Sequence, residues 1–245
     1  MEHDVQPHEY RASFLAKLLT RILWIDDPEA YERRRVGSDW PADAETMVGL
    51  ARLKNVLNLI FFINGERPRI DGDFMECGVW RGGCAIMMAA AQRETKLSFK
   101  RYVPDRTIWV ADSFQGCPPP SLPQDAGDVH HTMRFLSVSR AEVEANFKRY
   151  GLLRDNVKFL EGWFKDTLPG PVEKLALLRI DCDLYESTMQ VLEAMYPKMS
   201  KGGYVIVDDY GAVLGCKLAV DEYRAKNNIT SQIVHVDWTG IWWEV

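Results

Sequence analysis

The chain has 245 residues, of which 47% are hydrophobic, and it carries a formal net charge of −5. This size and apolar content suit one large α/β domain with an extension. The negative charge argues against broad nucleic-acid binding, which depends on a positive surface. No apolar stretch is long enough to cross a bilayer, and the first residues, Met1-Glu-His-Asp4, lack the pattern of a signal peptide. Five cysteines without framework spacing favour a reducing, cytoplasmic setting.

The first 66 residues are predicted to form a helical extension. Apolar side chains between Tyr10 and Trp24 repeat near the helical period. A loop is expected around residues 36–41, and Asp43 is expected to cap a second helix that carries Met47 to Ile60. The arginines at 33–35 are expected on a solvated helix face. The extension either covers a ligand pocket or packs against a second copy of the chain in a homodimer, and the sequence leaves both open.

Residues 67–245 are predicted to form one domain in which strands and helices alternate. Such alternation favours a parallel sheet with right-handed crossovers, and a closing hairpin at 232–236 and 240–245 adds an antiparallel edge. Strands are expected at 73–77, 107–112, 157–161, 175–181 and 203–208, and helices at 85–93, 139–150, 184–197 and 216–226.

Two of the predicted strands stop abruptly in carboxylates. The run from Leu175 ends in Asp181 and Asp183, and the run from Tyr204 ends in Asp208 and Asp209. Open α/β sheets bind ligands at the carboxyl ends of their strands, so these four acids are expected to meet at one rim. Clustered carboxylates repel one another unless a cation lies among them. Oxygen ligands favour magnesium, manganese or calcium over zinc.

A glycine-rich turn follows the first predicted strand. The segment Glu76-Cys-Gly-Val-Trp-Arg-Gly-Gly83 lets the backbone approach a ligand closely, but it lacks the dinucleotide fingerprint. Asp112 ends the next strand, where an acid can accept hydrogen bonds from ribose hydroxyls. Trp163, after the third strand, is a candidate wall for adenine. Together these features indicate a nucleoside ligand such as S-adenosylmethionine.

Several unusual sequence motifs follow one another along the chain from Thr46 onward. They are Glu76-Cys-Gly-Val-Trp-Arg-Gly-Gly83, Trp109-Val-Ala-Asp-Ser-Phe-Gln-Gly116, Gly162-Trp-Phe-Lys-Asp-Thr-Leu-Pro169, Arg179-Ile-Asp-Cys-Asp-Leu-Tyr185 and Gly202-Gly-Tyr-Val-Ile-Val-Asp-Asp-Tyr210. Together they resemble the macrocin O-methyltransferase (TylF) family, whose members methylate sugar hydroxyls of antibiotics. The resemblance implies a class I methyltransferase (Rossmann-like) fold with a seven-stranded sheet. It also implies S-adenosylmethionine as methyl donor, a magnesium ion (or manganese), and a glycosylated small molecule as acceptor.

The resemblance also implies roles for individual residues. Asp181, Asp208 and Asp209 match the positions that hold the metal. A lid over the sugar corresponds to residues 125–139, within a longer segment 115–140, and carries His130. Its string Val129-His130-His131 departs from the family's usual Leu-His-Gln, which leaves the acceptor open. The residues implied or expected at the donor are Thr46, Glu76, Cys77, Gly78, Val79, Trp80, Asp112, Ser113, Gly162 and Trp163.

Asp183 and His130 are the candidates for the base that removes the proton from the acceptor hydroxyl. If the strand continues, Asp183 faces the same side as Asp181. Histidine has a pKa that suits proton removal near neutral pH. Asp183 is preferred because the sheet fixes its position, and its alternative role is a cap for the following helix or support for a metal ligand.

Other functions remain open at this point. The pair Asp181 and Asp183 mimics the D-x-D motif of metal-dependent glycosyltransferases. A catechol O-methyltransferase shares the metal chemistry, and a non-catalytic S-adenosylmethionine-binding protein shares the donor site.

Overall fold

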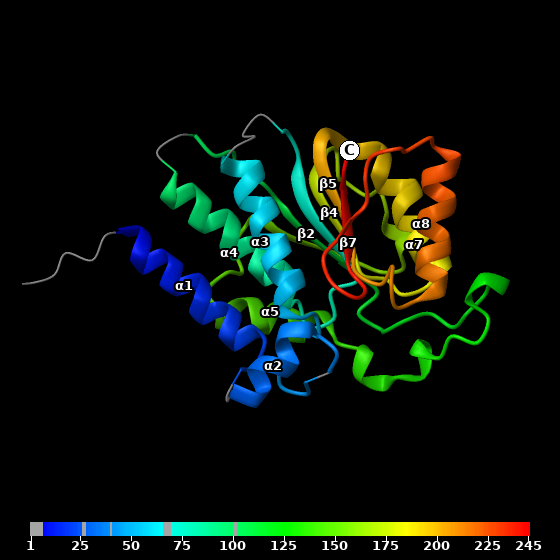
Figure 1. Ribbon diagram of the computed structural model, residues 1–245, viewed down its shortest axis with the longest axis horizontal. Coiled ribbons are helices and arrows are strands. Elements are labelled where there is room, and N and C mark those ends of the chain that lie inside the picture. The colour runs from blue at the N-terminus through cyan, green and yellow to red at the C-terminus, as the bar shows by residue number, and fades with distance from the viewer. Residues whose placement is uncertain (1–6, 26–27, 40, 66–69, 100–101) are drawn as a thin grey trace, which may run out of the picture.

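The computed structural model describes residues 7–25, 28–39, 41–65, 70–99 and 102–245 (Figure 1). The segment Met1–Asp4 and the predicted domain boundary between residues 66 and 67 lie outside these ranges. Within the described ranges, no helix combines the length and apolarity that crossing a bilayer requires.

The centre of the molecule is a seven-stranded sheet in the order β3-β2-β1-β4-β5-β7-β6. Strands β1 to β5 are paired in parallel, whereas β7 runs antiparallel to both β5 and β6. This confirms the mostly parallel sheet with an antiparallel carboxyl-terminal hairpin. The strands are β1 (Asp73–Cys77), β2 (Ile108–Asp112), β3 (Val157–Glu161), β4 (Leu175–Ile180), β5 (Met199–Val207), β6 (Val234–His235) and β7 (Ile241–Glu244).

Helices cover both faces of the sheet, which is why its central strands are apolar on both sides. On one face lie α3, α4 and α5, with α1 packed on α4; on the other lie α7 and α8 (Figure 1). Successive strand residues serve opposite cores, so Phe74 joins the first cluster and Met75 the second. The helices are α1 (Pro7–Ile22), α2 (Pro28–Val36), α3 (Leu50–Gly65), α4 (Gly83–Ser98), α5 (Arg140–Arg149), α6 (Phe164–Thr167), α7 (Tyr185–Met195) and α8 (Leu214–Lys226).

The amino-terminal extension differs from its prediction in two places. Helix α3 begins at Leu50, so Asp43 does not cap it. The residues before it form an irregular segment whose Glu45 carbonyl accepts a hydrogen bond from the Gly83 amide at 2.9 Å, at the start of α4. Arg34 is buried instead of solvated, because its guanidinium donates to the Leu23 carbonyl at 2.9 Å and pairs with Asp39. The extension therefore packs on the domain as part of one core.

The predicted lid runs past the carboxyl edge of the sheet as short 3-10 turns, Pro123–Asp125, His130–Thr132 and Arg134–Leu136. Its anchor is Asp125, which is buried. The Asp125 carboxylate accepts hydrogen bonds from the amides of Tyr185 at 2.6 Å and Glu186 at 3.1 Å. These amides belong to the first turn of α7, whose donors have no partner within the helix. Asp125 thus caps α7, the helix for which the sequence offers Asp183 as an alternative cap.

We expect Asp125→Ala to lower the free energy of unfolding by about 0.5–2 kcal/mol, the usual cost of losing a helix cap. Urea unfolding measures this change. Ser139→Ala is the matched control, because it removes the bond from the Glu142 amide to Ser139 Oγ at the start of α5. Only Asp125→Ala should also speed proteolytic cleavage within residues 115–140, and equal cleavage in both variants would contradict this role for Asp125.

Candidate active site

A cavity of about 450 Å³ opens at the carboxyl ends of β1, β2 and β4. Most of the predicted donor residues line it, and so do two of the four acids. The predicted residues in its wall are Gly78, Trp80, Asp112, Ser113, Gly162, Trp163, Asp181 and Asp183.

The other predicted donor residues lie behind this wall. Glu76 and Cys77 are buried within β1, and the Val79 amide donates to Asp112 at 2.7 Å. Thr46 is buried against Gly83, where an added β-carbon would lie 2.7 Å from the Thr46 β-carbon. Its neighbour Met47 lines the cavity instead. These four residues therefore support the cavity from outside its surface.

The glycine turn after β1 passes directly against Asp181, the residue that follows β4. Gly78 has a φ of 81°, and a β-carbon there would lie 1.8 Å from the carbonyl oxygen of Asp181. Only glycine fits this approach. Trp80, two residues further along the turn, also has a positive φ of 45°, and its indole nitrogen donates to the Phe135 carbonyl of the lid at 2.8 Å. The turn therefore connects the sheet with the lid.

Asp112 is held by the backbone of that turn. Its two carboxylate oxygens accept hydrogen bonds from the amides of Val79 at 2.7 Å and Phe114 at 2.8 Å. Burial raises the pKa of Asp112, and these amide bonds oppose the rise. Asp112 also lines the cavity, so its carboxylate can accept a hydrogen bond from a hydroxyl there.

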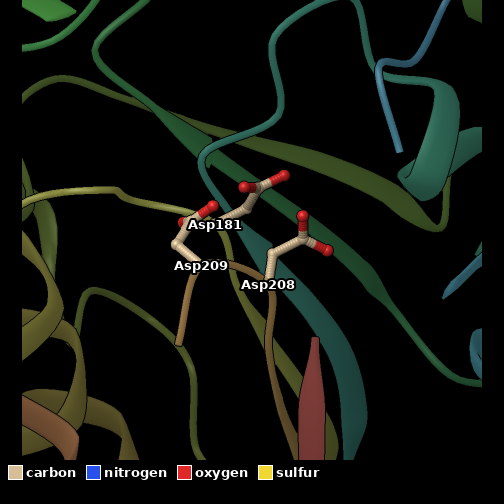
Figure 2. A group of neighbouring side chains, drawn as sticks. All are labelled: Asp181, Asp208 and Asp209. Atoms are coloured by element: carbon tan, nitrogen blue, oxygen red, sulfur yellow. The ribbon is translucent and has the colours of Figure 1, made fainter. Parts of the chain in front are cut away.

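Figure 2 shows three carboxylates gathered where β4 and β5 end. Asp181, Asp208 and Asp209 each offer one oxygen, and these oxygens lie within 4.8 Å of one another. The structure therefore brings together the three predicted metal ligands.

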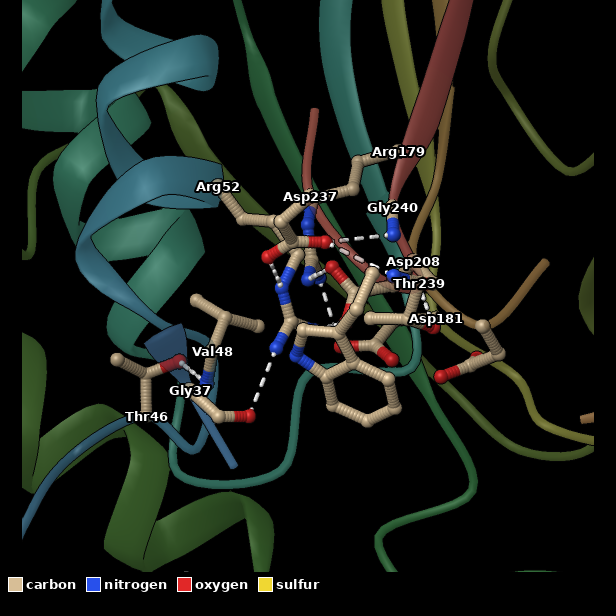
Figure 3. A network of polar contacts seen from close by, with 12 residues as sticks. Gly37, Thr46, Val48, Arg52, Arg179, Asp181, Asp208, Asp237, Thr239 and Gly240 are labelled. Carbon is tan, nitrogen blue, oxygen red and sulfur yellow. Dashed lines mark hydrogen bonds and ion pairs between the residues drawn. The ribbon is translucent and has the colours of Figure 1, made fainter. Parts of the chain in front are cut away.

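Two arginines contact two of these acids, Asp181 and Asp208 (Figure 3). Arg179, inside β4, donates to Asp181 at 2.8 Å and contacts Asp208. Arg52, from α3, pairs with Asp208 on its other oxygen. Burial opposes the ionisation of Asp208, but Arg179 and Arg52 outweigh it and lower the pKa of this acid. Asp208 is thus kept ionised.

The other two acids of the cluster are compensated less well. Burial, followed by Asp208 and Asp183, raises the pKa of Asp181 to about 7 against the effect of Arg179. Burial, followed by Asp183 and Asp181, raises the pKa of Asp209 well above its usual range. A divalent cation would relieve this excess negative charge, and the donors are all carboxylate oxygens. The residues present therefore fit a hard cation such as magnesium.

Asp183 and His130, the two candidate bases, are neighbours. His130 Nδ1 lies 2.7 Å from a carboxylate oxygen of Asp128, and Nε2 lies 3.9 Å from Asp183 Oδ1. Burial lowers the pKa of His130, but Asp183 and Asp128 outweigh it and raise the pKa overall. Burial also raises the pKa of Asp183, which strengthens it as a base. The predicted strand continuation is wrong, because β4 ends at Ile180 and Asp183 adopts a φ of 57°.

Several residues of the site have no counterpart in the sequence predictions. Arg179 could have been predicted from the sequence, because a charged residue inside an apolar strand needs a buried partner. Arg52 and Asp128 gave no such signal, since an arginine in an amphipathic helix and an aspartate in a loop are both common. Cys117, whose thiol lies 3.6 Å from an Asp183 oxygen, and Glu186 also line the cavity.

The chain is similar to known proteins in both sequence and structure. The family model described as macrocin-O-methyltransferase (TylF) matches residues 3–245. Demethyldecarbamoylnovobiocin O-methyltransferase from Streptomyces niveus is 48% identical over 218 residues, covering 87% of this chain and 80% of that one.

A second relative comes from Streptomyces olivaceus. It is 8-demethyl-8-(2,3-dimethoxy-alpha-L-rhamnosyl)-tetracenomycin-C 4'-O-methyltransferase, 42% identical over 244 residues, with 94% and 90% of the two chains covered. Among solved structures, the O-methyltransferase NovP superposes with a TM-score of 0.89 at 43% identity, covering 96% of this chain and 98% of that one. These matches decide for methyl transfer and against glycosyl transfer. The chain belongs to the macrocin-O-methyltransferase (TylF) family and is an O-methyltransferase.

Proposed function

We propose that this enzyme transfers a methyl group from S-adenosylmethionine to a sugar hydroxyl of a glycosylated natural product, with a divalent cation held beside the acceptor. The observation that carries this proposal is the position of the three clustered carboxylates beside a cavity lined by Asp112 and the glycine turn. The name of the Streptomyces olivaceus relative describes transfer to the 4' oxygen of a rhamnosylated tetracenomycin. This supports a sugar-bearing antibiotic precursor as the acceptor class.

The donor would occupy the cavity at the edge of the sheet. Asp112 would accept hydrogen bonds from the ribose hydroxyls, and Trp163 and Gly162 would lie against the adenine. The methionine end would lie near Gly78, because this residue and Trp80 line the cavity where the glycine turn leaves the sheet. Ser113 supports the loop after Asp112, because its hydroxyl donates to the Gly116 carbonyl at 2.9 Å.

Asp181, Asp208 and Asp209 would hold magnesium or manganese. When bound, the ion orients the acceptor hydroxyl and lowers its pKa. The chain's own residues supply the rest of the chemistry by positioning the reactants and excluding water beneath the lid.

Asp183 is the better of the two candidate bases. It lines the cavity, whereas His130 lies on the lid behind it. His130 Nε2 lies 3.9 Å from Asp183 Oδ1, so a protonated His130 would favour the ionised form of Asp183. Asp183 would therefore take the hydroxyl proton, and His130, oriented by Asp128, would stabilise the charge of Asp183.

We also propose that the chain forms a homodimer, which light scattering of the purified protein can test.

Donor binding can be measured without any acceptor. Isothermal titration with S-adenosylmethionine should show a single site, and Asp112→Asn should weaken binding about 10–100-fold, because it replaces an acceptor of charged hydrogen bonds. Asp221→Asn, in an exposed ion pair with Lys217, should bind as the wild type does. Equal affinities in all three proteins would exclude Asp112 from the donor site.

Metal dependence tests the proposed reaction itself. Chelation should abolish the gain of about 14 Da in glycoside acceptors, and added magnesium or manganese should restore it. Asp209→Asn should lower methyl transfer about 100-fold while leaving metal-free donor binding intact, because a metal ligand is lost. Full activity in the presence of chelator, or no transfer to any glycoside, would refute the proposal.

The pH dependence separates the two bases. Asp183→Asn should lower kcat about 100- to 10,000-fold, the usual contribution of a general base. His130→Asn should lower kcat less and move the acidic limb of the kcat/KM profile to higher pH. This direction follows because the charge of His130 lowers the pKa of Asp183. A larger kcat loss for His130→Asn than for Asp183→Asn would assign the base to the histidine.

A further inference from the structure

Arg52 brings the amino-terminal extension into direct contact with the carboxylate cluster (Figure 3). It lies on the first turn of α3 and is only 6% exposed. Its guanidinium donates to three acceptors in different parts of the chain: the carboxylate of Asp208, the Asp237 carboxylate at 3.0 Å and the Gly37 carbonyl at 3.1 Å. Arg52 therefore links the extension to the residues after β5 and to the turn before β7.

The partners of Arg52 are themselves fixed. The other oxygen of Asp237 accepts hydrogen bonds from the amides of Thr239 at 3.1 Å and Gly240 at 2.8 Å. The Thr239 hydroxyl donates to the backbone carbonyl of Asp208 at 2.8 Å. The turn between β6 and β7 and the end of β5 therefore form one hydrogen-bonded unit, and Arg52 joins it from outside.

The extension side of this contact has little freedom. A β-carbon on Gly37 would lie 2.3 Å from the Gly49 amide nitrogen, so the two backbones touch. The indole nitrogen of Trp238 donates to the carbonyl of Val36 at 3.0 Å. The Gly37 carbonyl and the turn that carries Asp237 are therefore held in place on either side of the Arg52 guanidinium.

We propose that Arg52 is a positioning residue that holds the Asp208 carboxylate in the orientation that a divalent cation requires. The extension is then a working part of the metal site as well as a cover for the sheet. This inference rests on the metal site of the proposed function.

Two effects of Arg52 oppose each other. Its positive charge repels a cation at the neighbouring acids, which alone would make binding tighter after its removal. Its planar fork, however, orders Asp208 and Asp237 together, and without it both buried carboxylates must turn toward other partners or water. Residues that orient metal ligands typically change metal affinity 10–100-fold when they are removed. We expect orientation to outweigh repulsion.

The test is a titration of the full chain with manganese, with the free ion followed by electron paramagnetic resonance. Arg52→Met should bind manganese about 10–100-fold more weakly than the wild type. Arg52→Lys keeps the charge but loses the fork, so its affinity should lie between the two.

Arg34→Met is the matched control, because Arg34 is also a buried, ion-paired arginine of the extension but contacts Leu23 and Asp39. It should bind manganese as the wild type does. Metal-free titration with S-adenosylhomocysteine should give equal affinities in all four proteins, which shows that the donor site remains folded.

The outcomes separate this inference from the proposed function. No manganese binding by the wild type would refute the metal site itself. Wild-type binding with equal or tighter binding by Arg52→Met would overturn the role of Arg52, as would equal losses in Arg34→Met. If Arg52→Met does not fold, Arg52→Lys decides, and wild-type affinity in that variant contradicts the inference.

Discussion

The site depends on a buried arginine in the middle of the sheet. Arg179 is 1% exposed on β4, and its guanidinium bonds carboxylates on the two neighbouring strands, Glu76 on β1 and Asp208 after β5, together with Asp181. Isolated, each of these charges would be costly to bury. Together they set the spacing of three strand ends, and breaking such a buried pair typically costs about 3–5 kcal/mol. The cavity and the carboxylate cluster lie at the ends of these strands.

Much of the fold was predictable because its signals are local. The apolar runs of β1 and β3 match their predicted bounds, and the rule that ligands lie at the carboxyl ends of parallel strands located the acid cluster. The pairing of charges was not predictable in the same way. Arg52 and Asp208 are 156 residues apart in sequence, and no periodicity or motif connects them. Such contacts follow only from the packing of α3 against the sheet.

Asp183 shows how a correct expectation can have an incorrect reason. Strand alternation predicted that it would face the same side as Asp181, yet the strand ends before both residues. Its left-handed backbone conformation turns the side chain into the cavity, and its amide donates to Asp209 at 3.1 Å. The cap of α7 then comes from Asp125 in the lid. The segment from Asp181 to Glu186 therefore contacts both the carboxylate cluster and residue Asp125 of segment 115–140.

The contact between Gly78 and the Asp181 carbonyl has a practical meaning for engineering. No side chain fits between Gly78 and the Asp181 carbonyl, so a substitution at Gly78 would disturb both the glycine turn and the segment after β4. Libraries aimed at new acceptors should leave this pair of positions untouched. Diversity is better introduced at an exposed side chain of segment 115–140, such as Val129.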